Sequence, residues 1–319
     1  MTNEIITQPL LVLVGPTAIG KTALSLTLAA RYDCEIVSVD SMQVYRHMDI
    51  GTAKATKEER GDIMHHLIDI VDPNENYDAA RFSVDSLKVI RDIHNRGKLP
   101  LLTGGTGLYL RALLHGIFPG VPADEEVRRA LHRRLEEEGC SKLHEELFAI
   151  DCVSALRIDK NDSQRLLRAL EIYYVSGVPW SLHLEEQRKQ SPKIVFTNLL
   201  LIGLTCDREQ LYARINRRCQ KMVDTGLENE VQKLLAMGYN RSMKSFGAIG
   251  YRHMIGYLDG KWSLEEMIRL LTRDTRRYAK RQYTWFSKMD DLLWFQVNEP
   301  ARIVQFIDEW MTNKELWNL

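Results

Sequence analysis

The chain has 319 residues, of which 45% are hydrophobic and 27% charged, and its formal net charge is zero. This composition is typical of a globular protein with one large or two modest domains, and the neutral charge by itself argues against a nucleic-acid partner. Five scattered cysteines without a C-x-x-C pair argue against a zinc site or a disulfide framework. The first apolar run ends at Gly15, too early for a signal or membrane helix, so we expect a cytoplasmic protein without membrane contact.

The first predicted elements enclose a glycine-rich loop. Leu10 to Val14 is an unbroken apolar run typical of a strand buried on both faces, and Ala23 to Ala30 contains strong helix formers. The loop between them matches the phosphate-binding pattern G-x-x-x-x-G-K-[ST] and reads Gly15-Pro16-Thr17-Ala18-Ile19-Gly20-Lys21-Thr22. Its N–H groups and the helix N-terminus would bind a phosphate, Lys21 would add positive charge, and the Thr22 hydroxyl would hold Mg²⁺.

A second strand is predicted over Glu35 to Val39, and Asp40 follows it. Ligands of open α/β sheets bind beyond the carboxyl ends of the strands, so Asp40 is expected at the same edge as the phosphate loop. Its carboxylate suits a general base for a nucleophile that approaches the bound phosphate substrate. An aspartate after a strand is equally typical of a helix N-cap, and the local sequence does not separate the two interpretations.

The next segments predict a helix over Ala80 to Asn95 and a third buried strand over Leu99 to Thr103. A second glycine loop, Gly104 to Gly107, follows this strand and is expected at the same edge of the sheet. No apolar strand ends in the acid that helps phosphate-loop NTPases to hold Mg²⁺, so we expect the first loop to bind something other than a hydrolysed nucleotide. His65 and His66 are poor candidates for one metal ion, because adjacent side chains diverge.

After a turn-rich exit at Ile117 to Pro122, the pattern becomes helical. Asp124 is expected to cap the first of three helices, over 125–138, 141–150 and 163–176. A polar run, Glu185 to Ser191, then leads to an apolar strand, Lys193 to Leu204, that rejoins the sheet. We therefore expect an α/β fold with a P-loop-containing parallel sheet core flanked by helices. The core would comprise 1–118 and 191–319, and 119–190 would be an all-helical insert.

The C-terminal part contains a strongly basic helix. Its positive residues recur at three- and four-residue steps and are Arg269, Arg273, Arg276, Arg277, Lys280 and Arg281. Asp274 is the only acid among them. Unpaired like charges repel along a helix face, so this basic stripe is expected to bind a polyanion, which reverses the argument from net charge.

Three smaller features complete this region. Asp207 and Gln210 suggest a capping box, and Trp294 to Leu319 reads as an edge strand with a closing amphipathic helix. Four aromatic residues near the stripe would either stack on bases or pack in the core: Tyr278, Tyr283, Trp285 and Phe286.

Taken together, the motifs resemble the tRNA dimethylallyltransferase family, the bacterial tRNA isopentenyltransferases, over nearly the whole chain. Besides the phosphate loop, the matching stretches are Ser38-Val39-Asp40-Ser41-Met42-Gln43-Val44-Tyr45, Asp49-Ile50-Gly51-Thr52-Ala53-Lys54, His65-His66-Leu67-Ile68-Asp69, Gly104-Gly105-Thr106-Gly107-Leu108-Tyr109, Gln164-Arg165-Leu166-Leu167-Arg168-Ala169-Leu170, Ile249-Gly250-Tyr251-Arg252 and Ala279-Lys280-Arg281-Gln282. Ile19 departs from the family, which more often has serine there, and a C-terminal zinc finger of eukaryotic relatives is absent.

The resemblance implies transfer of a dimethylallyl group from dimethylallyl diphosphate to N6 of the adenosine 3′-adjacent to the anticodon of tRNA, with release of diphosphate and a need for Mg²⁺. The implied catalytic residues are Lys21, Asp40, Thr106 and Arg218. Arg218 is chosen from the family pattern Arg214-x-x-x-Arg218-x-x-x-Met222, although Arg217 is adjacent and the sequence does not decide between them.

Matching residue by residue also implies a set of tRNA contacts, with the insert clamping the anticodon stem-loop. The set comprises Asp40, Ser41, Met42, Gln43, Thr106, Arg128, Gln164, Arg165, Leu166, Leu167, Arg168, Gly247, Ala248, Ile249, Gly250, Tyr251, Arg252, Lys280 and Arg281. We expect a monomer. Three alternatives stay open on the residues alone: a small-molecule or nucleoside kinase, a transferase that prenylates free adenine nucleotides, and an RNA-binding protein without catalysis.

Overall fold

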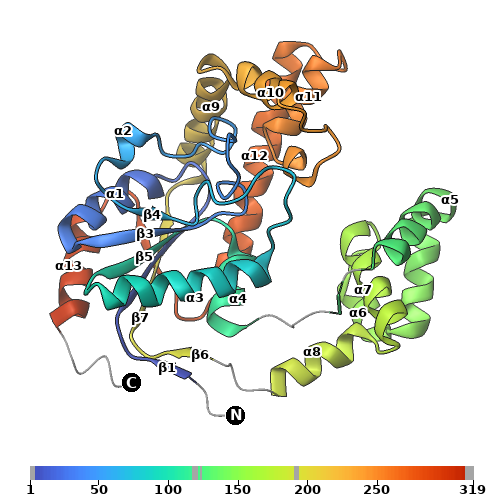
Figure 1. Ribbon diagram of the computed structural model, residues 1–319, viewed down its shortest axis with the longest axis horizontal. Coiled ribbons are helices and arrows are strands. Elements are labelled where there is room, and N and C mark those ends of the chain that lie inside the picture. The colour runs from blue at the N-terminus through green and yellow to red at the C-terminus, as the bar shows by residue number, and fades with distance from the viewer. Residues whose placement is uncertain (1–3, 117–120, 123, 190–193, 313–319) are drawn as a thin grey trace. The chain divides into compact units, whose positions relative to one another are not determined.

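All strand pairs in the structure are parallel, as the buried apolar runs of the sequence predict. The computed structural model describes residues 4–116, 121–122, 124–189 and 194–312 (Figure 1). The strands are β1 (Glu4–Ile6), β2 (Leu10–Val14), β3 (Cys34–Val39), β4 (His65–His66), β5 (Leu99–Gly104), β6 (Ile194–Phe196), β7 (Leu199–Thr205) and β8 (Leu293–Gln296). Six of them form the main sheet in the order β4-β3-β5-β2-β7-β8.

The central strands of this sheet are buried on both faces. Every residue of β2 and of β3 is buried. Because successive side chains of a strand point to opposite faces, full burial requires that helices cover both faces. The phosphate loop follows β2, Asp40 follows β3 and the second glycine loop follows β5, so parallel pairing brings these three segments to one edge.

The strand predicted over Lys193 to Leu204 is interrupted, which corrects the expectation. Its described part forms β6, which pairs with β1 in a separate two-stranded sheet, and β7, which joins the main sheet. The register explains the break, because Ile6 pairs with Phe196 whereas Leu10 pairs with Leu199, which leaves segments of unequal length between the strands. Pro9 lies in the longer segment and has no N–H to donate to a ladder.

The larger of two compact units comprises Glu4–His115 and Ile194–Leu319. Its helices are α1 (Lys21–Tyr32), α2 (Lys57–Arg60), α3 (Ala79–Asn95), α4 (Gly107–His115), α9 (Arg208–Asp224), α10 (Leu227–Ala236), α11 (Tyr251–Leu258), α12 (Leu264–Phe286) and α13 (Pro300–Thr312), with a 3₁₀ turn at Lys244–Gly247. α1 and α3 pack against β3 and β5, while α9 to α12 pack against one another in a group of their own (Figure 1). The capping box predicted at α9 is absent, because Asp207 accepts no backbone hydrogen bond with its side chain.

The smaller unit, chiefly Gly116–Lys193, is helical where it is described. It contains α5 (Glu125–Ile150), α6 (Cys152–Arg157), α7 (Ser163–Ser176) and α8 (Trp180–Lys189) around a leucine-rich core. The predicted helices 125–138 and 141–150 are confirmed as the two helical segments of α5, because Gly139 between them has a non-helical conformation with φ 80° and ψ 166°. Neither α6 nor any part of α8 was predicted from the sequence, which indicated only a polar run from Glu185. Residues 117–120 of the predicted exit turn lie outside the described residues, as do the predicted domain boundaries at 118/119 and 190/191.

Among the helices of the described residues, none is both long enough and apolar enough to cross a membrane.

Candidate active site

A cavity of about 220 Å³ lies at the carboxyl edge of the main sheet. The phosphate loop, the second glycine loop and Asp40 contribute to its lining, as the sequence predicts, and α9 and α12 add Arg218, Tyr278 and Gln282. Three strands and two helices that are distant in sequence therefore converge on one polar, partly enclosed space within the larger unit.

The phosphate loop is held in shape by its own lysine. Lys21 Nζ donates hydrogen bonds to the carbonyl oxygens of Gly15 and Pro16, both at 2.9 Å. Burial, together with the neighbouring charge of Arg218, lowers the pKa of Lys21 to about 7, and Asp40 acts in the opposite direction. A bound anion would raise this pKa again, because it favours the charged ammonium. Ile19, the departure from the family pattern, is fully buried, so an apolar residue suits its position.

Asp40 faces the cavity, and the helix N-cap interpretation is wrong, because the residues after it form a turn and no helix begins there. Its side chain instead caps this turn. Its Oδ1 atom accepts hydrogen bonds from the backbone N–H groups of Met42 at 2.9 Å and Gln43 at 3.3 Å. The described residues donate no hydrogen bond to Oδ2. One carboxylate oxygen thus fixes the turn after β3, and the other is free to accept a proton.

Arg218 and Arg217 differ sharply in their surroundings. Arg218 lines the cavity and is half-buried, whereas Arg217 is exposed, because adjacent helical residues point about 100° apart. Burial lowers the pKa of Arg218, and Asp40 partly offsets this effect; the guanidinium stays protonated. Arg218 Nη2 donates to the carbonyl oxygen of Thr52 at 3.5 Å.

Thr106 lies where the second glycine loop meets the turn after β3. Its Oγ1 atom accepts a hydrogen bond from the Ser41 N–H at 3.0 Å and also interacts with the hydroxyl of Tyr278. Burial and the charge of Asp40 raise the pKa of Tyr278, so its hydroxyl stays protonated. Tyr278 is therefore a cavity residue, while Phe286 of the same aromatic group is fully buried in the core.

Gln282 connects the two glycine loops, and the sequence analysis did not assign it a role. Its Oε1 accepts the N–H of Thr17 at 2.8 Å, and its Nε2 donates to the carbonyl oxygen of Gly105 at 2.9 Å. A Cβ atom at Gly105 would collide with the Gln282 amide, so any larger residue there would displace the side chain of Gln282. The available signal was the spacing of Tyr278 and Gln282, four residues apart on α12, which puts them on one helix face.

Mg²⁺ is compatible with the oxygen atoms around this cavity. The hydroxyl of Thr22 and the carboxylate of Asp40 line it, and Thr103 Oγ1 is buried there without a hydrogen-bond partner among the described residues. These are hard oxygen donors, which Mg²⁺ prefers. The described residues contain no cluster of three or more His, Cys, Asp or Glu side chains suited to a metal. A magnesium ion bound mainly through substrate oxygens and water does not need one.

The basic stripe does lie on one helix, α12, but its charges are partly paired, which corrects the expectation of an unpaired face. Asp274 Oδ1 lies 2.9 Å from the guanidinium of Arg273 and 3.7 Å from that of Arg277. Its Oδ2 lies 2.7 Å from the guanidinium of Arg252. Arg269 pairs with Glu266 and Arg276 bonds to Asn216. Lys280 and Arg281, by contrast, are exposed, and the Arg281 guanidinium lies 5.7 Å from the centre of the Tyr278 ring.

Several residues predicted to contact tRNA are buried, and their side chains cannot do so. Leu166 and Leu167 belong to the core of the smaller unit, and Tyr251 is fully buried beneath the segment around Gly51. The periodicity of an amphipathic helix puts some residues of any contiguous motif inside. Gly250 is also buried.

The other predicted contacts are accessible to different degrees. Ser41, Met42 and Gln43 form the turn beside the cavity, and Gly247, Ala248, Ile249 and Arg252 reach the surface. In the smaller unit Gln164 and Arg165 are exposed. Arg128 and Arg168 instead hold the buried Glu171, at 2.7 and 2.8 Å, so much of their charge is neutralised internally.

His65 and His66 have separate environments. His65 lines the cavity, where burial lowers its pKa, and its Nδ1 lies 2.8 Å from the carbonyl oxygen of Ile63. His66 Nε2 contacts the carboxylate of Glu35 at 2.6 Å.

Comparison with known proteins identifies similar sequences over the whole chain. Residues 43–289 match the family described as IPP transferase, and residues 8–69 match isopentenyl transferase. The chain is 55% identical to a tRNA dimethylallyltransferase of Desulfotalea psychrophila over 99% of its own length and all of that protein. It is 46% identical to a tRNA dimethylallyltransferase of Acetivibrio thermocellus, covering 91% of this chain and 92% of that one.

Solved structures give the same result. The full-length tRNA isopentenylpyrophosphate transferase of Bacillus halodurans has a TM-score of 0.70 and 44% identity, covering 96% of this chain and 98% of that one. A eukaryotic dimethylallyltransferase solved acting on tRNA has a TM-score of 0.77 and 28% identity, covering 96% of this chain and 80% of that one.

Proposed function

Because this chain belongs to the IPP transferase family of tRNA dimethylallyltransferases, we propose a specific chemical role for each group in its cavity. The chain is an enzyme that transfers a dimethylallyl group from dimethylallyl diphosphate to N6 of the adenosine 3′-adjacent to the anticodon. This activity accounts for the phosphate loop without a nucleotide-hydrolysing apparatus, since the loop would grip a leaving diphosphate.

One observation supports the assignment most strongly: Lys21, Arg218 and Asp40 line one cavity between two glycine loops. Two cations suit a group on which negative charge increases, and one carboxylate suits a group that must lose a proton. The same cavity has apolar wall residues, among them Ile36, Ala53 and Ile68, that suit a five-carbon hydrocarbon.

The reaction breaks the bond between C1 of the allyl group and the bridging oxygen of the diphosphate. The electron pair of that bond goes to the diphosphate, whose growing charge is stabilised by the N–H groups of the phosphate loop, by Lys21 and by Arg218. The lone pair of N6 forms the new C–N bond with C1. Asp40 Oδ2 accepts the proton that N6 loses, while Oδ1 keeps the turn in place.

We assign the metal role to Mg²⁺, which would be held by the Thr22 hydroxyl together with substrate oxygens and water. When bound, it neutralises part of the charge on the diphosphate. Thr106, held by Ser41 and Tyr278, is placed beside Asp40 to orient the incoming adenosine.

The adenine must leave the stack of the anticodon loop to reach an enclosed cavity. We assign the docking of the anticodon stem-loop to the exposed cations Lys280 and Arg281, to the turn over Ser41, Met42 and Gln43, and to the helical insert. Since the substrate is tRNA, we assign the enzyme to the cytoplasm; the monomer stays an expectation.

A transfer assay with two acceptors tests this function. Radiolabelled dimethylallyl diphosphate and Mg²⁺ are incubated with purified protein and either unmodified tRNA that has adenosine beside its anticodon, or free AMP, and no ATP is added. We expect label in the tRNA alone. A Lys21→Met variant, whose unbranched side chain is one heavy atom shorter and carries no charge, reports any contaminating transferase.

Label in AMP alone would replace the proposed acceptor by a free nucleotide. Label in neither, with ATP turnover when candidate acceptors are supplied, would contradict the proposal in favour of a kinase.

A further inference from the structure

One wall of the cavity is a segment without regular structure, Asp49 to Ala55. Ala53 and Ala55 line the cavity directly. The carbonyl oxygen of Thr52, between them and Asp49, accepts hydrogen bonds from Arg218 Nη2 at 3.5 Å and from Gln43 Nε2 at 3.4 Å. The position of this wall segment therefore influences where the guanidinium of Arg218 lies.

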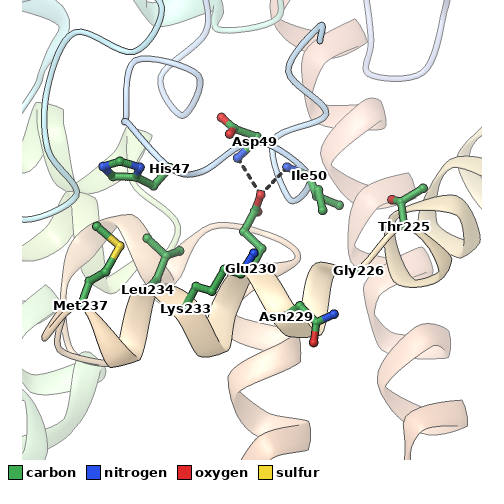
Figure 2. Close-up of a pocket in the computed structure, with 10 residues that line it drawn as sticks. All are labelled: His47, Asp49, Ile50, Thr225, Gly226, Asn229, Glu230, Lys233, Leu234 and Met237. Atoms are coloured by element: carbon green, nitrogen blue, oxygen red, sulfur yellow. Dashed lines mark hydrogen bonds between the residues drawn. The ribbon is translucent and has the colours of Figure 1, made fainter. Parts of the chain in front are cut away.

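One carboxylate accepts three successive backbone N–H groups of the wall segment. Glu230, on α10, accepts hydrogen bonds through Oε2 from the N–H groups of Asp49 at 3.0 Å and Ile50 at 2.7 Å. Its Oε1 accepts the N–H of Gly51 at 3.0 Å and the hydroxyl of Tyr251 at 2.5 Å. Figure 2 shows Glu230 reaching from the helix to the loop, in a pocket of about 350 Å³.

These contacts are specific to a carboxylate. Three successive backbone N–H groups converge on two oxygens, and charge-assisted hydrogen bonds of this kind are stronger than neutral ones. All four donors are satisfied by Glu230, so its carboxylate is engaged inside the protein and is not free to hold a ligand in the pocket of Figure 2.

Contacts with neighbouring groups make the wall segment stiff. A displacement of its backbone at Glu230 would therefore also move the Thr52 carbonyl. Lys54 Nζ, almost completely buried, binds Asp49 at 2.6 Å and Asp69 at 2.5 Å. The Tyr251 ring occupies the space where a Cβ atom of residue 51 would lie, so Gly51 admits no side chain. Thr52 Oγ1 donates to the carbonyl oxygen of Met48 at 2.7 Å.

We propose that Glu230 is a positioning residue for the transfer reaction, which fixes the segment Asp49 to Ala55 and through the Thr52 carbonyl orients Arg218 toward the leaving diphosphate. Glu230 touches no substrate, and its effect passes through Arg218. The inference rests on the role proposed above for Arg218.

A double-mutant cycle on the full-length protein tests it. The variants are Glu230→Gln, Arg218→Gln and both together. The readout is the single-turnover rate of label transfer to saturating tRNA, divided by the concentration of protein that binds tRNA. Glutamine has the size of glutamate but has an NH₂ group where two of the backbone donors need an acceptor. We expect Glu230→Gln to slow transfer about tenfold, the size that follows from leaving buried donors unpaired, with tRNA affinity unchanged.

The coupling distinguishes positioning from a general loss of stability. On the Arg218→Gln background, Glu230→Gln should cost less than about twofold, because the group it orients is already gone. Glu228→Gln is the matched control: it makes the same change on the same helix, where the carboxylate accepts a hydrogen bond from Gln232 Nε2 at 3.0 Å and from no other side chain of the described residues. It should leave the rate unchanged.

Two outcomes separate the failures. If Arg218→Gln alone transfers at the wild-type rate, the proposed role of Arg218 is wrong. The positioning role of Glu230 is overturned if Arg218→Gln is slow but Glu230→Gln has no effect on the rate. It is also overturned if Glu230→Gln slows the Arg218→Gln variant as much as it slows the wild type. In both cases the proposed role of Arg218 stands.

Should Glu230→Gln not fold, Tyr251→Phe takes its place in the cycle. This variant removes one of the four bonds to the carboxylate, and its smaller loss of rate must likewise vanish on the Arg218→Gln background.

Discussion

Asp40 combines two functions in one carboxylate, and the hydrogen bonds show how. Oδ1 is occupied by the N–H groups of Met42 and Gln43, which fixes the turn after β3, and Oδ2 accepts nothing from the described residues. A substitution that removes the whole carboxylate would therefore disturb both the turn and the proposed proton transfer. The two functions can be separated by asparagine, whose oxygen can still cap the turn.

We predict that Asp40→Asn lowers the single-turnover rate of transfer by about 10² to 10⁴, the range typical for loss of a general base. The affinity for tRNA should stay close to that of the unmodified protein, because the turn over Ser41 to Gln43 is preserved. Rapid-quench measurement of label transfer, together with filter binding of the same tRNA, gives both quantities.

Asp78→Asn is the matched control, since Asp78 caps α3 by accepting from the N–H groups of Ala80 and Arg81, away from the cavity. It should transfer at the wild-type rate. Equal losses of rate and of tRNA affinity in Asp40→Asn would assign Asp40 to binding and not to proton transfer.

Among the elements, α12 contributes to three parts of the molecule with three of its faces. Met267, Leu271 and Phe286 pack in the core, and Tyr278 and Gln282 face the cavity. The third face is the basic stripe. At its centre Asp274 is only 14% exposed and lies among Arg252, Arg273, Arg277 and His253, so it offsets the repulsion between these cations.

This cluster makes a prediction about stability and pH. Burial alone would raise the pKa of Asp274, but hydrogen bonds and charges from Arg273 and Arg252 outweigh it and lower the pKa to about 2. A carboxyl group with a lowered folded-state pKa adds stability that is present above its unfolded pKa and is lost as pH falls through the folded value. Asp274→Asn should therefore reduce the free energy of unfolding by about 1–2 kcal/mol, equally at pH 7 and pH 5, after allowance for solvent screening.

Urea denaturation at the two pH values measures this difference. Glu266→Gln, which removes the exposed pair with Arg269 on the same helix, should leave the free energy of unfolding unchanged within the precision of the measurement. If the loss of free energy of unfolding in Asp274→Asn differs between pH 7 and pH 5, the interaction responsible is the one with His253, whose pKa is lowered mainly by burial.

For the whole molecule, the distribution of charge matters more than its sum. The formal net charge is zero, yet the cations at the C-terminal end of the stripe, Lys280 and Arg281, are exposed, and the Arg281 guanidinium lies over the ring of Tyr278 at the cavity. Cations that are already paired inside the protein release few counterions from a nucleic acid, whereas exposed ones release about one for each phosphate neutralised.

We predict that Lys280→Ala combined with Arg281→Ala weakens tRNA binding and reduces the slope of log affinity against log salt by about 1.5, as expected for two lost phosphate contacts. Titrations at several salt concentrations measure it. Lys57→Ala with Lys88→Ala removes the same charge from the exposed surfaces of α2 and α3 and should leave the slope unchanged. The same slope in both double variants would exclude Lys280 and Arg281 from the interface.

The sequence by itself determined the features that depend on neighbours along the chain. An unbroken apolar run predicted β2, mainly apolar segments predicted β3 and β5 to within a residue, helix signals predicted α3 and α7, and the pattern from Gly15 to Thr22 predicted a phosphate loop. The parallel arrangement then placed Lys21 and Asp40 at one edge, because parallel strands end together. Such inferences succeed because buried strands, helices and glycine loops are defined by local spacing, whereas the capping box predicted at Asp207 is absent.

Only the tertiary structure decided which side of each element faces the site. Gln282 bonds to Thr17, 265 residues away, and Glu230 bonds to Ile50, 180 residues away, and no local pattern encodes either contact. Arg218 differs from Arg217, and the buried Tyr251 from the exposed Arg252, solely through the packing of α9 and α11 against their neighbours. Propensity and periodicity describe one segment at a time, whereas burial and charge pairing depend on segments that folding brings together.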